Sequence, residues 1–119
     1  MSNDNNEALA EPFDIDHLRL RPEDLECARR RADVVAERYW TERLRNSSRD
    51  SETYQSYLDS STWFRKRMRR LAIDRRVCGD CGGAASEVHH RHYLTLGHES
   101  VEDLVSVCRE CHAARHGKA

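Results

Sequence analysis

The stretch that decides the fold is residues 78–116, which read CGDCGGAASEVHHRHYLTLGHESVEDLVSVCRECHAARH. These 39 residues hold four of the five cysteines and six of the seven histidines of the 119-residue chain. Thiolates and imidazoles are the side chains that most often bind zinc and related divalent metals. Their concentration in one part of the chain predicts that metal ions organise this region.

Two CxxC pairs in this stretch have the spacing of a structural zinc site. Twenty-six residues separate the pairs, and each pair forms a tight turn that directs both sulfurs towards one tetrahedral ion. The alternatives are two disulfides, which need an oxidising compartment, and a redox CxxC, which needs a thioredoxin-like βαβ context. Zinc would replace a hydrophobic core that this segment cannot build. The predicted zinc ligands are Cys78, Cys81, Cys108 and Cys111.

A zinc site made of four cysteines is closed and needs none of the six histidines, and four of them have an informative order and spacing. His112 and His116 are four residues apart and share one face of the last predicted helix. His89 and His90 are adjacent in a strand predicted over residues 87–91, so they point to its opposite faces. Their order predicts a second metal site. Each position also has a simpler explanation when it is taken alone. Exposed histidines are common on helices, and an adjacent His pair can arise by chance.

Two longer runs surround these ligands: YLDSSTWFRKRMRRLAIDRRVCGDC at residues 57–81 and EVHHRHYLTLGHESVEDLVSVCRECH at residues 87–112. Together they resemble the HNH endonuclease family in its zinc-ribbon-supported, ββα-metal form, and one phage and bacterial subgroup in particular. The resemblance covers about residues 57–116, whereas nothing comparable supports residues 1–50. It implies an α+β fold, a small zinc-stabilised ββα-metal (His-Me finger) domain with preceding α-helices.

The resemblance implies a role for each remaining histidine. His89 and His112 would bind the catalytic divalent ion. His90 would be the general base, and His116 would complete the metal site or hold the scissile phosphate. The family's middle Asn, which holds the base histidine in its productive tautomer, corresponds here to Asp103. An aspartate can do the same by accepting from the other ring N–H, so this departure is compatible with catalysis.

The implied reaction is hydrolysis of DNA phosphodiester bonds. A neutral histidine is suited to deprotonate the attacking water near pH 7, and a divalent ion relieves charge on the phosphate in the transition state. Imidazole ligands admit Mg²⁺, Mn²⁺, Ni²⁺ or Zn²⁺. The predicted cofactors are therefore a structural Zn²⁺ and one catalytic cation of open identity. Sequence specificity, nicking against double-strand cleavage, and DNA against RNA stay open as well.

A basic helix is predicted before the first CxxC, over residues 63–75, with a Ser-Ser-Thr cap at residues 60–62. Residues 62–119 carry 11 basic and 7 acidic side chains, whereas residues 1–61 carry 9 basic and 14 acidic ones. This asymmetry favours a nucleic-acid surface in the C-terminal half, although a solvated face is the usual origin of a charge run. The predicted DNA-binding residues are Arg65, Lys66, Arg67, Arg69, Arg70, Arg91 and Arg115.

The N-terminal part divides into a tail and a helix. Residues 1–21 are predicted to be a disordered or extended tail. Residues 22–52 are predicted to form an amphipathic helix over 23–45 and a linker, because Pro22 suits the first turn and apolar residues then recur at helical spacing. The apolar stripe either packs on its own domain or binds a second copy or a protein partner. Residues 53–119 are the predicted nuclease domain.

The composition of the chain bears on its expected compartment. Charged residues make up 34 % of the chain and its mean hydropathy is −0.90. No apolar run has membrane-spanning length and no secretory signal is visible, so a reducing cytoplasm is the expected compartment. Two other functions compete with the nuclease: a non-catalytic zinc-ribbon module that binds nucleic acid or a protein partner, and a toxin or defence nuclease that needs an N-terminal partner.

Overall fold

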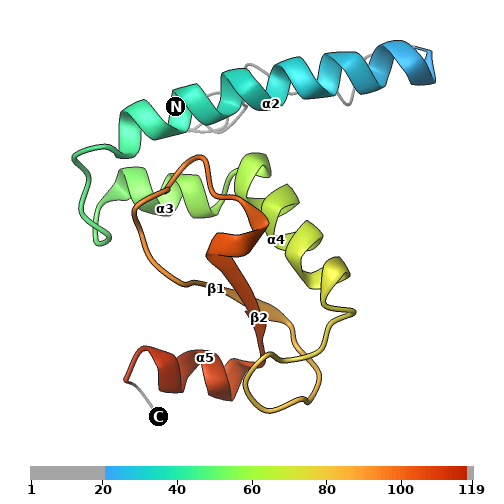
Figure 1. Ribbon diagram of the computed structural model, residues 1–119. Helices are drawn as coiled ribbons and strands as arrows, with labels where there is room; N and C mark the ends of the chain where they lie inside the picture. The colour runs from blue at the N-terminus through green and yellow to red at the C-terminus, as the bar shows by residue number, and fades with distance from the viewer. Residues whose placement is uncertain (1–20, 118–119) are drawn as a thin grey trace, which may run out of the picture.

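The computed structural model describes residues 21–117, so all but the last residue of the predicted tail lies outside the described part. The described part is a small α+β structure with four α-helices and a two-stranded antiparallel sheet (Figure 1). None of its helices has the length and apolar composition that crossing a membrane requires. The elements are, in order, α2 (Pro22–Leu44), α3 (Glu52–Leu58), α4 (Ser61–Ile73), β1 (Glu87–His90), η1 (Val101–Asp103), β2 (Leu104–Val107) and α5 (Arg109–Arg115).

The helices begin where the sequence supplies capping groups. Pro22 occupies the first turn of α2, where its missing N–H costs nothing and two acidic residues follow it. Ser60 caps α4 by accepting a hydrogen bond from the Trp63 N–H at 3.2 Å, which confirms the predicted cap. The structure adds α3 after the predicted linker, and Ser51 caps it by accepting from the Tyr54 N–H at 3.1 Å.

The sheet places the two adjacent histidines on different sides. β1 and β2 pair in antiparallel register, with His89 opposite Val105 and His90 opposite Leu104. Successive residues of a strand point to opposite faces. The His89 ring therefore meets α5, where it lies 5.3 Å from the ring of His112, whereas the His90 ring meets α4. Figure 1 shows α5 at the end of the molecule opposite α2.

One core joins the N-terminal helix to the sheet. Trp40 of α2 is 6 % exposed, and its ring lies 5.3 Å from that of Tyr57 in α3. Tyr57 lies 6.0 Å from Trp63 in α4, and the buried cluster continues through Leu104 and Val107 of β2. In the described part of the chain, α2 thus packs on its own domain, the first of the two outcomes that its sequence left open. The boundary predicted after the linker does not divide two cores.

The loop between β1 and η1 is fixed against the helices. Thr41 Oγ1 of α2 lies 2.9 Å from His98 Nδ1. The backbone at Gly97 approaches Thr41 so closely that an added Cβ would lie 2.7 Å from the Thr41 nitrogen. Lys66 of α4 donates to the Glu99 carbonyl at 2.8 Å. The N-terminal helix therefore helps to position a loop of the histidine-rich segment (Figure 1).

Gly97→Ala is expected to destabilise the protein by about 3 kcal/mol or more, because Gly97 has φ +94° and the added Cβ would overlap the Thr41 backbone. Gly117→Ala is the matched control. Its φ of +73° is also left-handed, but no atom lies within 4 Å of the added carbon. Only the conformational cost of about 1 kcal/mol is expected there. Urea denaturation measures both losses, and equal losses would contradict a close contact with α2.

Candidate functional site

The four predicted zinc ligands form a four-cysteine cluster, in which all sulfurs lie within 4.8 Å of one another. Cys78 and Cys81 lie in the turn before β1. Cys108 and Cys111 lie at the start of α5, where the Cys108 sulfur accepts from the Cys111 N–H. The Cys81 and Cys108 sulfurs are 3.8 Å apart. Sulfurs at about 2.3 Å from a tetrahedral zinc are separated by about 3.8 Å, so the cluster has the right size to hold a structural metal such as zinc.

The thiols of this cluster need a cation to ionise together. The Cys78 sulfur accepts from the Cys81 and Asp80 N–H groups, both at 3.4 Å, and these bonds, the one from Cys81 first, lower the pKa of Cys78 to about 6. The pKa of Cys111 is raised, first by its hydrogen bond to Cys108 and then by burial. A divalent ion would remove this conflict. All five cysteines are free thiols in the structure, so the four sulfurs of the cluster are available to a metal.

Three predicted ligands form a second group, the three-histidine cluster, on the α5 side of the sheet. His89 of β1 and His112 and His116 of α5 each offer a ring nitrogen within 4.8 Å of the others. The Nε2 atoms of His112 and His116 are 3.3 Å apart. Nitrogens at about 2.0–2.1 Å from a tetrahedral ion are separated by about 3.3–3.4 Å. The cluster could therefore hold a divalent metal.

The electrostatics of this cluster suit a metal better than a proton. Nδ1 of His89 is buried and has no hydrogen-bond partner among the described residues. Burial, and then repulsion from His116 and His112, lower the pKa of His89 to about 4, which keeps its ring neutral and its lone pair available. Glu87 lies 2.7 Å from His112 Nδ1. A carboxylate behind a histidine directs the other ring nitrogen towards a metal.

The predicted general base, His90, lies on the other side of the sheet and is 6 % exposed. Its ring stacks on Trp63, with centroids 4.5 Å apart, and on Tyr93, with centroids 5.5 Å apart. Its Nε2 lies 2.7 Å from Glu99 Oε2. The other oxygen of Glu99 accepts from the Tyr57 hydroxyl at 2.5 Å. His90 is therefore held by two aromatic rings and, at one nitrogen, by a carboxylate.

Asp103 does not hold His90, in contrast to the role that the resemblance implied. Its carboxylate lies 3.0 Å from His92 Nε2 and accepts from the Thr95 hydroxyl at 2.8 Å and the Ser100 N–H at 3.0 Å. With Ser100 it forms a capping box at the start of η1. These bonds, the one from the Ser100 N–H first, lower the pKa of Asp103 to about 2. Asp103 thus ties the loop together, and another carboxylate holds the predicted base.

One cavity brings the two histidine groups together. It has a volume of about 390 Å³ and is lined by His90, by His112 and His116 of the three-histidine cluster, and by Arg67 of α4. Glu87, the partner of His112, lines it as well. Although His89 and His90 leave the sheet on different sides, a ligand in this cavity would meet the predicted base and two of the predicted metal ligands.

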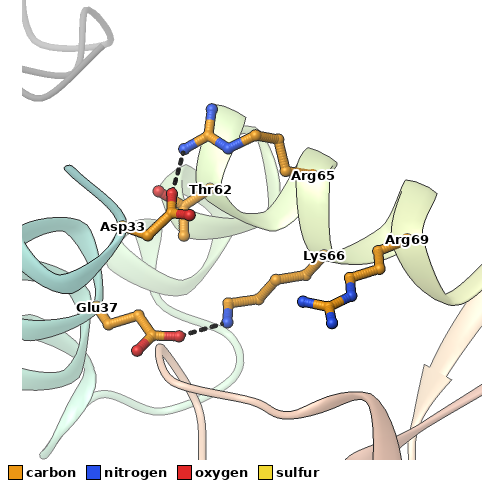
Figure 2. Close-up of a pocket in the computed structure, with 6 residues that line it drawn as sticks. All are labelled: Asp33, Glu37, Thr62, Arg65, Lys66 and Arg69. Atoms are coloured by element: carbon orange, nitrogen blue, oxygen red, sulfur yellow. Dashed lines mark hydrogen bonds and ion pairs between the residues drawn. The ribbon is translucent and has the colours of Figure 1, made fainter. Parts of the chain in front are cut away.

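Two of the predicted DNA-binding side chains hold α4 to α2. Figure 2 shows Lys66 bonded to Glu37 at 2.7 Å and Arg65 paired with Asp33 at 3.6 Å. Arg69 lies in the same pocket and is exposed. The acids of α2 offset the charge of the first two side chains, so Lys66 and Arg65 act first as structural contacts.

Two more members of the predicted set are also bound within the protein. Arg70 pairs with Asp74 and donates to the Val101 carbonyl at 2.9 Å. Arg115 forms two hydrogen bonds with Asp80, at 2.7 and 2.8 Å. Within residues 21–117, the members of the set that form no such ion pair are Arg67, Arg69 and Arg91.

Three residues of this site were not predicted from the sequence: Glu87, Glu99 and Tyr57. A signal existed for Glu87, because it stands two residues before His89 in the predicted strand and so lies on the same face. No local signal joins Tyr57 to Glu99, since 42 residues separate them. Their contact depends on how the loop docks.

No protein-family model matches the chain, and no curated protein is significantly similar to it. The likeness to HNH endonucleases therefore rests on the sequence runs quoted above. The function has to be inferred from the chemistry of the cavity.

Proposed function

We propose that this protein is a metal-dependent endonuclease of the HNH type that hydrolyses DNA. The observation that carries the proposal is the cavity shared by His90, which is bound to a buried carboxylate, and by two members of the three-histidine cluster. Phosphodiester hydrolysis needs a positioned base beside a metal with few protein ligands, because water and substrate must fill its other positions. A zinc ion in the four-cysteine cluster would hold α5 against the turn before β1.

In the proposed reaction, His90 takes a proton from the attacking water as the water oxygen bonds to phosphorus. The bond from phosphorus to the leaving 3′ oxygen breaks, and that oxygen takes a proton from solvent. A divalent ion bound by His89, His112 and His116 would supply charge relief at the phosphate. Glu87 orients His112 for this, and burial keeps His89 in the neutral form that binds cations.

Phosphate contacts are proposed for a smaller set of basic residues than the sequence predicted. Arg67 lines the cavity beside the histidines, and Arg69 and Arg91 are exposed. Such side chains bind a polyanion by releasing its counterions, and contacts to phosphate carry no sequence information.

A second candidate function is a non-catalytic zinc-ribbon module that binds nucleic acid or a protein partner. One observation favours it: His90 is only 6 % exposed, as a core histidine would be. Titration of the zinc-loaded protein with Mn²⁺ or Ni²⁺ separates the two functions. The endonuclease should bind one further ion, whereas the binding module should bind none.

Supercoiled plasmid is expected to be cleaved by the zinc-loaded protein with Mg²⁺, Mn²⁺ or Ni²⁺ and to stay intact with EDTA. His90→Ala should lower the rate by roughly 10²–10⁴-fold, the usual contribution of a general base, because no other group then accepts the proton of the water. The zinc content should not change, since His90 is not a member of either cluster. Initial rates from agarose gels measure the effect.

His17→Ala is the matched control, because His17 is the one histidine outside residues 78–116. It should cleave at the wild-type rate. Unchanged metal-dependent cleavage by His90→Ala would remove His90 as the base. Folded, zinc-loaded protein that neither binds a second ion nor cleaves DNA would favour the binding module.

A further inference from the structure

A buried carboxylate, Glu99, lies between the Tyr57 hydroxyl and the His90 ring. We propose that Glu99, oriented by Tyr57, is a positioning residue that keeps the proton of neutral His90 on Nε2, so that Nδ1 is the atom that accepts a proton from water. This role rests on the proposed endonuclease function. It adds the two residues that set the tautomer and orientation of the proposed base.

The geometry lets Glu99 act only through its protein partners. Its Oε2 lies 2.7 Å from His90 Nε2, and its Oε1 accepts from the Tyr57 hydroxyl at 2.5 Å. The exposed fraction of the Glu99 side chain is 0 %. A carboxylate with a side-chain partner on each oxygen and no exposed surface does not touch substrate. Any effect on the reaction must pass through His90.

The charge of Glu99 decides which group donates in this contact. Burial raises the pKa of Glu99, but hydrogen bonds from His90 and Tyr57 outweigh burial and bring the pKa below its ordinary value. Burial, and then the charge of Glu99, raise the pKa of Tyr57, which therefore keeps its proton. An ionised carboxylate only accepts hydrogen bonds, so His90 Nε2 must donate. A neutral imidazole has one N–H, which leaves the lone pair on Nδ1.

The aromatic rings alone would not select this arrangement. Trp63 and Tyr93 lie within 14° and 28° of the plane of the His90 ring, so they define that plane. A half-turn of the ring about its broad χ2 torsion keeps the same plane but exchanges the positions of its nitrogen and carbon atoms. The bond to Glu99 distinguishes the two orientations, because only one of them presents Nε2 to the carboxylate.

Glu99 is itself anchored by elements far away in the sequence. Its carbonyl accepts from Lys66 Nζ at 2.8 Å, and Lys66 is held by Glu37 of α2 at 2.7 Å. The preceding residue, His98, lies 2.9 Å from Thr41 Oγ1 of α2. The N-terminal helix thus contributes to the proposed active site by fixing the backbone that carries Glu99.

The test combines the tautomer of His90 with cleavage kinetics in full-length, zinc-loaded protein. NMR of ¹⁵N-histidine-labelled wild type should show Nε2–H at neutral His90. In Glu99→Gln, the amide N–H₂ faces the ring when the amide oxygen accepts from Tyr57, so the Nδ1–H form should gain population. The value of kcat should then fall by up to roughly 10⁴-fold, the loss caused by an equivalent Asp→Asn change in a serine protease. KM should change by less than about threefold, because substrate binding is not altered.

Two matched variants separate positioning from a general effect on the fold. Asp103→Asn is the same kind of change in η1, which follows the loop, but Asp103 bonds His92, so the His90 tautomer should not change. Tyr57→Phe keeps the buried ring and removes the donor to Glu99. It should preserve the Nε2–H tautomer and lower kcat by about tenfold, which corresponds to one hydrogen bond.

An Nδ1–H ring at His90 in the wild-type protein would overturn the proposed role of Glu99, whether or not any variant folds. Wild-type kcat in folded Glu99→Gln would overturn it as well. The spectrum of the resting protein does not depend on cleavage. Wild-type protein that shows Nε2–H at His90 but never cleaves DNA would refute the endonuclease function and not the contact that holds the ring.

Discussion

Cys108→Ser is expected to unfold the C-terminal part of the protein and to lower the melting temperature by more than about 20 °C. The Cys108 sulfur lies 3.8 Å from that of Cys81 and also caps α5. Structural zinc contributes about 10–16 kcal/mol to small zinc-binding peptides, whereas a whole domain is stable by about 5–15 kcal/mol. Losing one thiolate therefore removes a contribution comparable to the total.

The sheet cannot compensate for that loss. It has two strands of four residues each, and a two-stranded sheet alone is marginal in water. The turn over residues 79–84 is exposed, and the single β-bridge between Val77 and Ala84 closes it. α5, with only seven residues, is too short to be stable by itself. These segments depend on the four-cysteine cluster for their position.

Melting followed by circular dichroism, together with zinc content from mass spectrometry, tests this expectation. Cys27→Ser is the matched control, because Cys27 lies in α2 outside the cluster. It should cost no more than about 1 kcal/mol. Cys108→Ser protein that keeps one zinc and the wild-type melting temperature would show that the four sulfurs do not form a structural site.

His112→Ala is expected to abolish binding of the second ion, and DNA cleavage with it, while one zinc per chain is retained. The substitution removes the Nε2 atom that lies 3.3 Å from His116 Nε2 and leaves the cluster with two ligands. Glu87→Gln should have a smaller effect in the same direction. The loss of a carboxylate behind a metal-bound histidine typically lowers metal affinity by about 10–100-fold, because the ring is then less well oriented.

Calorimetric titration with Mn²⁺ or Ni²⁺ measures these affinities, and the zinc content of each sample shows that the first site is intact. His92→Ala is the control, because His92 contacts Asp103 and is not a member of the cluster. It should bind the second ion as wild type does. Wild-type affinity for that ion in His112→Ala would exclude the three-histidine cluster as its site.

The two clusters could be predicted because their spacing is local. Each CxxC fixes two sulfurs in one turn, and His112 and His116 share a helical face at i, i+4. The only long-range step is the pairing of β1 with β2, which brings the two ends together. The cluster of four cysteines could therefore be predicted from their spacing. The side of the sheet on which His89 lies could be predicted from the alternation of side chains along a strand.

The acid that holds His90 could not be predicted in the same way. Glu99 lies in the loop before η1, four residues before Asp103 of η1 in the chain, and both are suitable acceptors for a histidine N–H. The docking of this loop on Thr41 decides which one reaches the ring, and Thr41 is 57 residues away from its partner His98. No pattern within the loop contains that information.

The partners of the basic side chains on α4 could not be predicted from the sequence either. The sequence indicates a run of cations over α4, but Lys66 meets Glu37 from 29 residues away and Arg70 meets the Val101 carbonyl from 31 residues away. Such partners become visible only when helices are packed. The prediction that the apolar stripe of α2 is buried was correct for Trp40, but it was wrong for Val35, which is 54 % exposed.

The register of the sheet has a further consequence. Because His89 faces Val105 and His90 faces Leu104, a slip of β1 by one residue would reverse both rings at the same time. His90 would then turn towards α5 and His89 towards Trp63, so neither cluster would keep its full set of groups. A misregistered molecule would therefore lose the proposed metal ligand and the proposed base together. If the proposed function is correct, a molecule with the shifted register should have no cleavage activity at all, and not a reduced one.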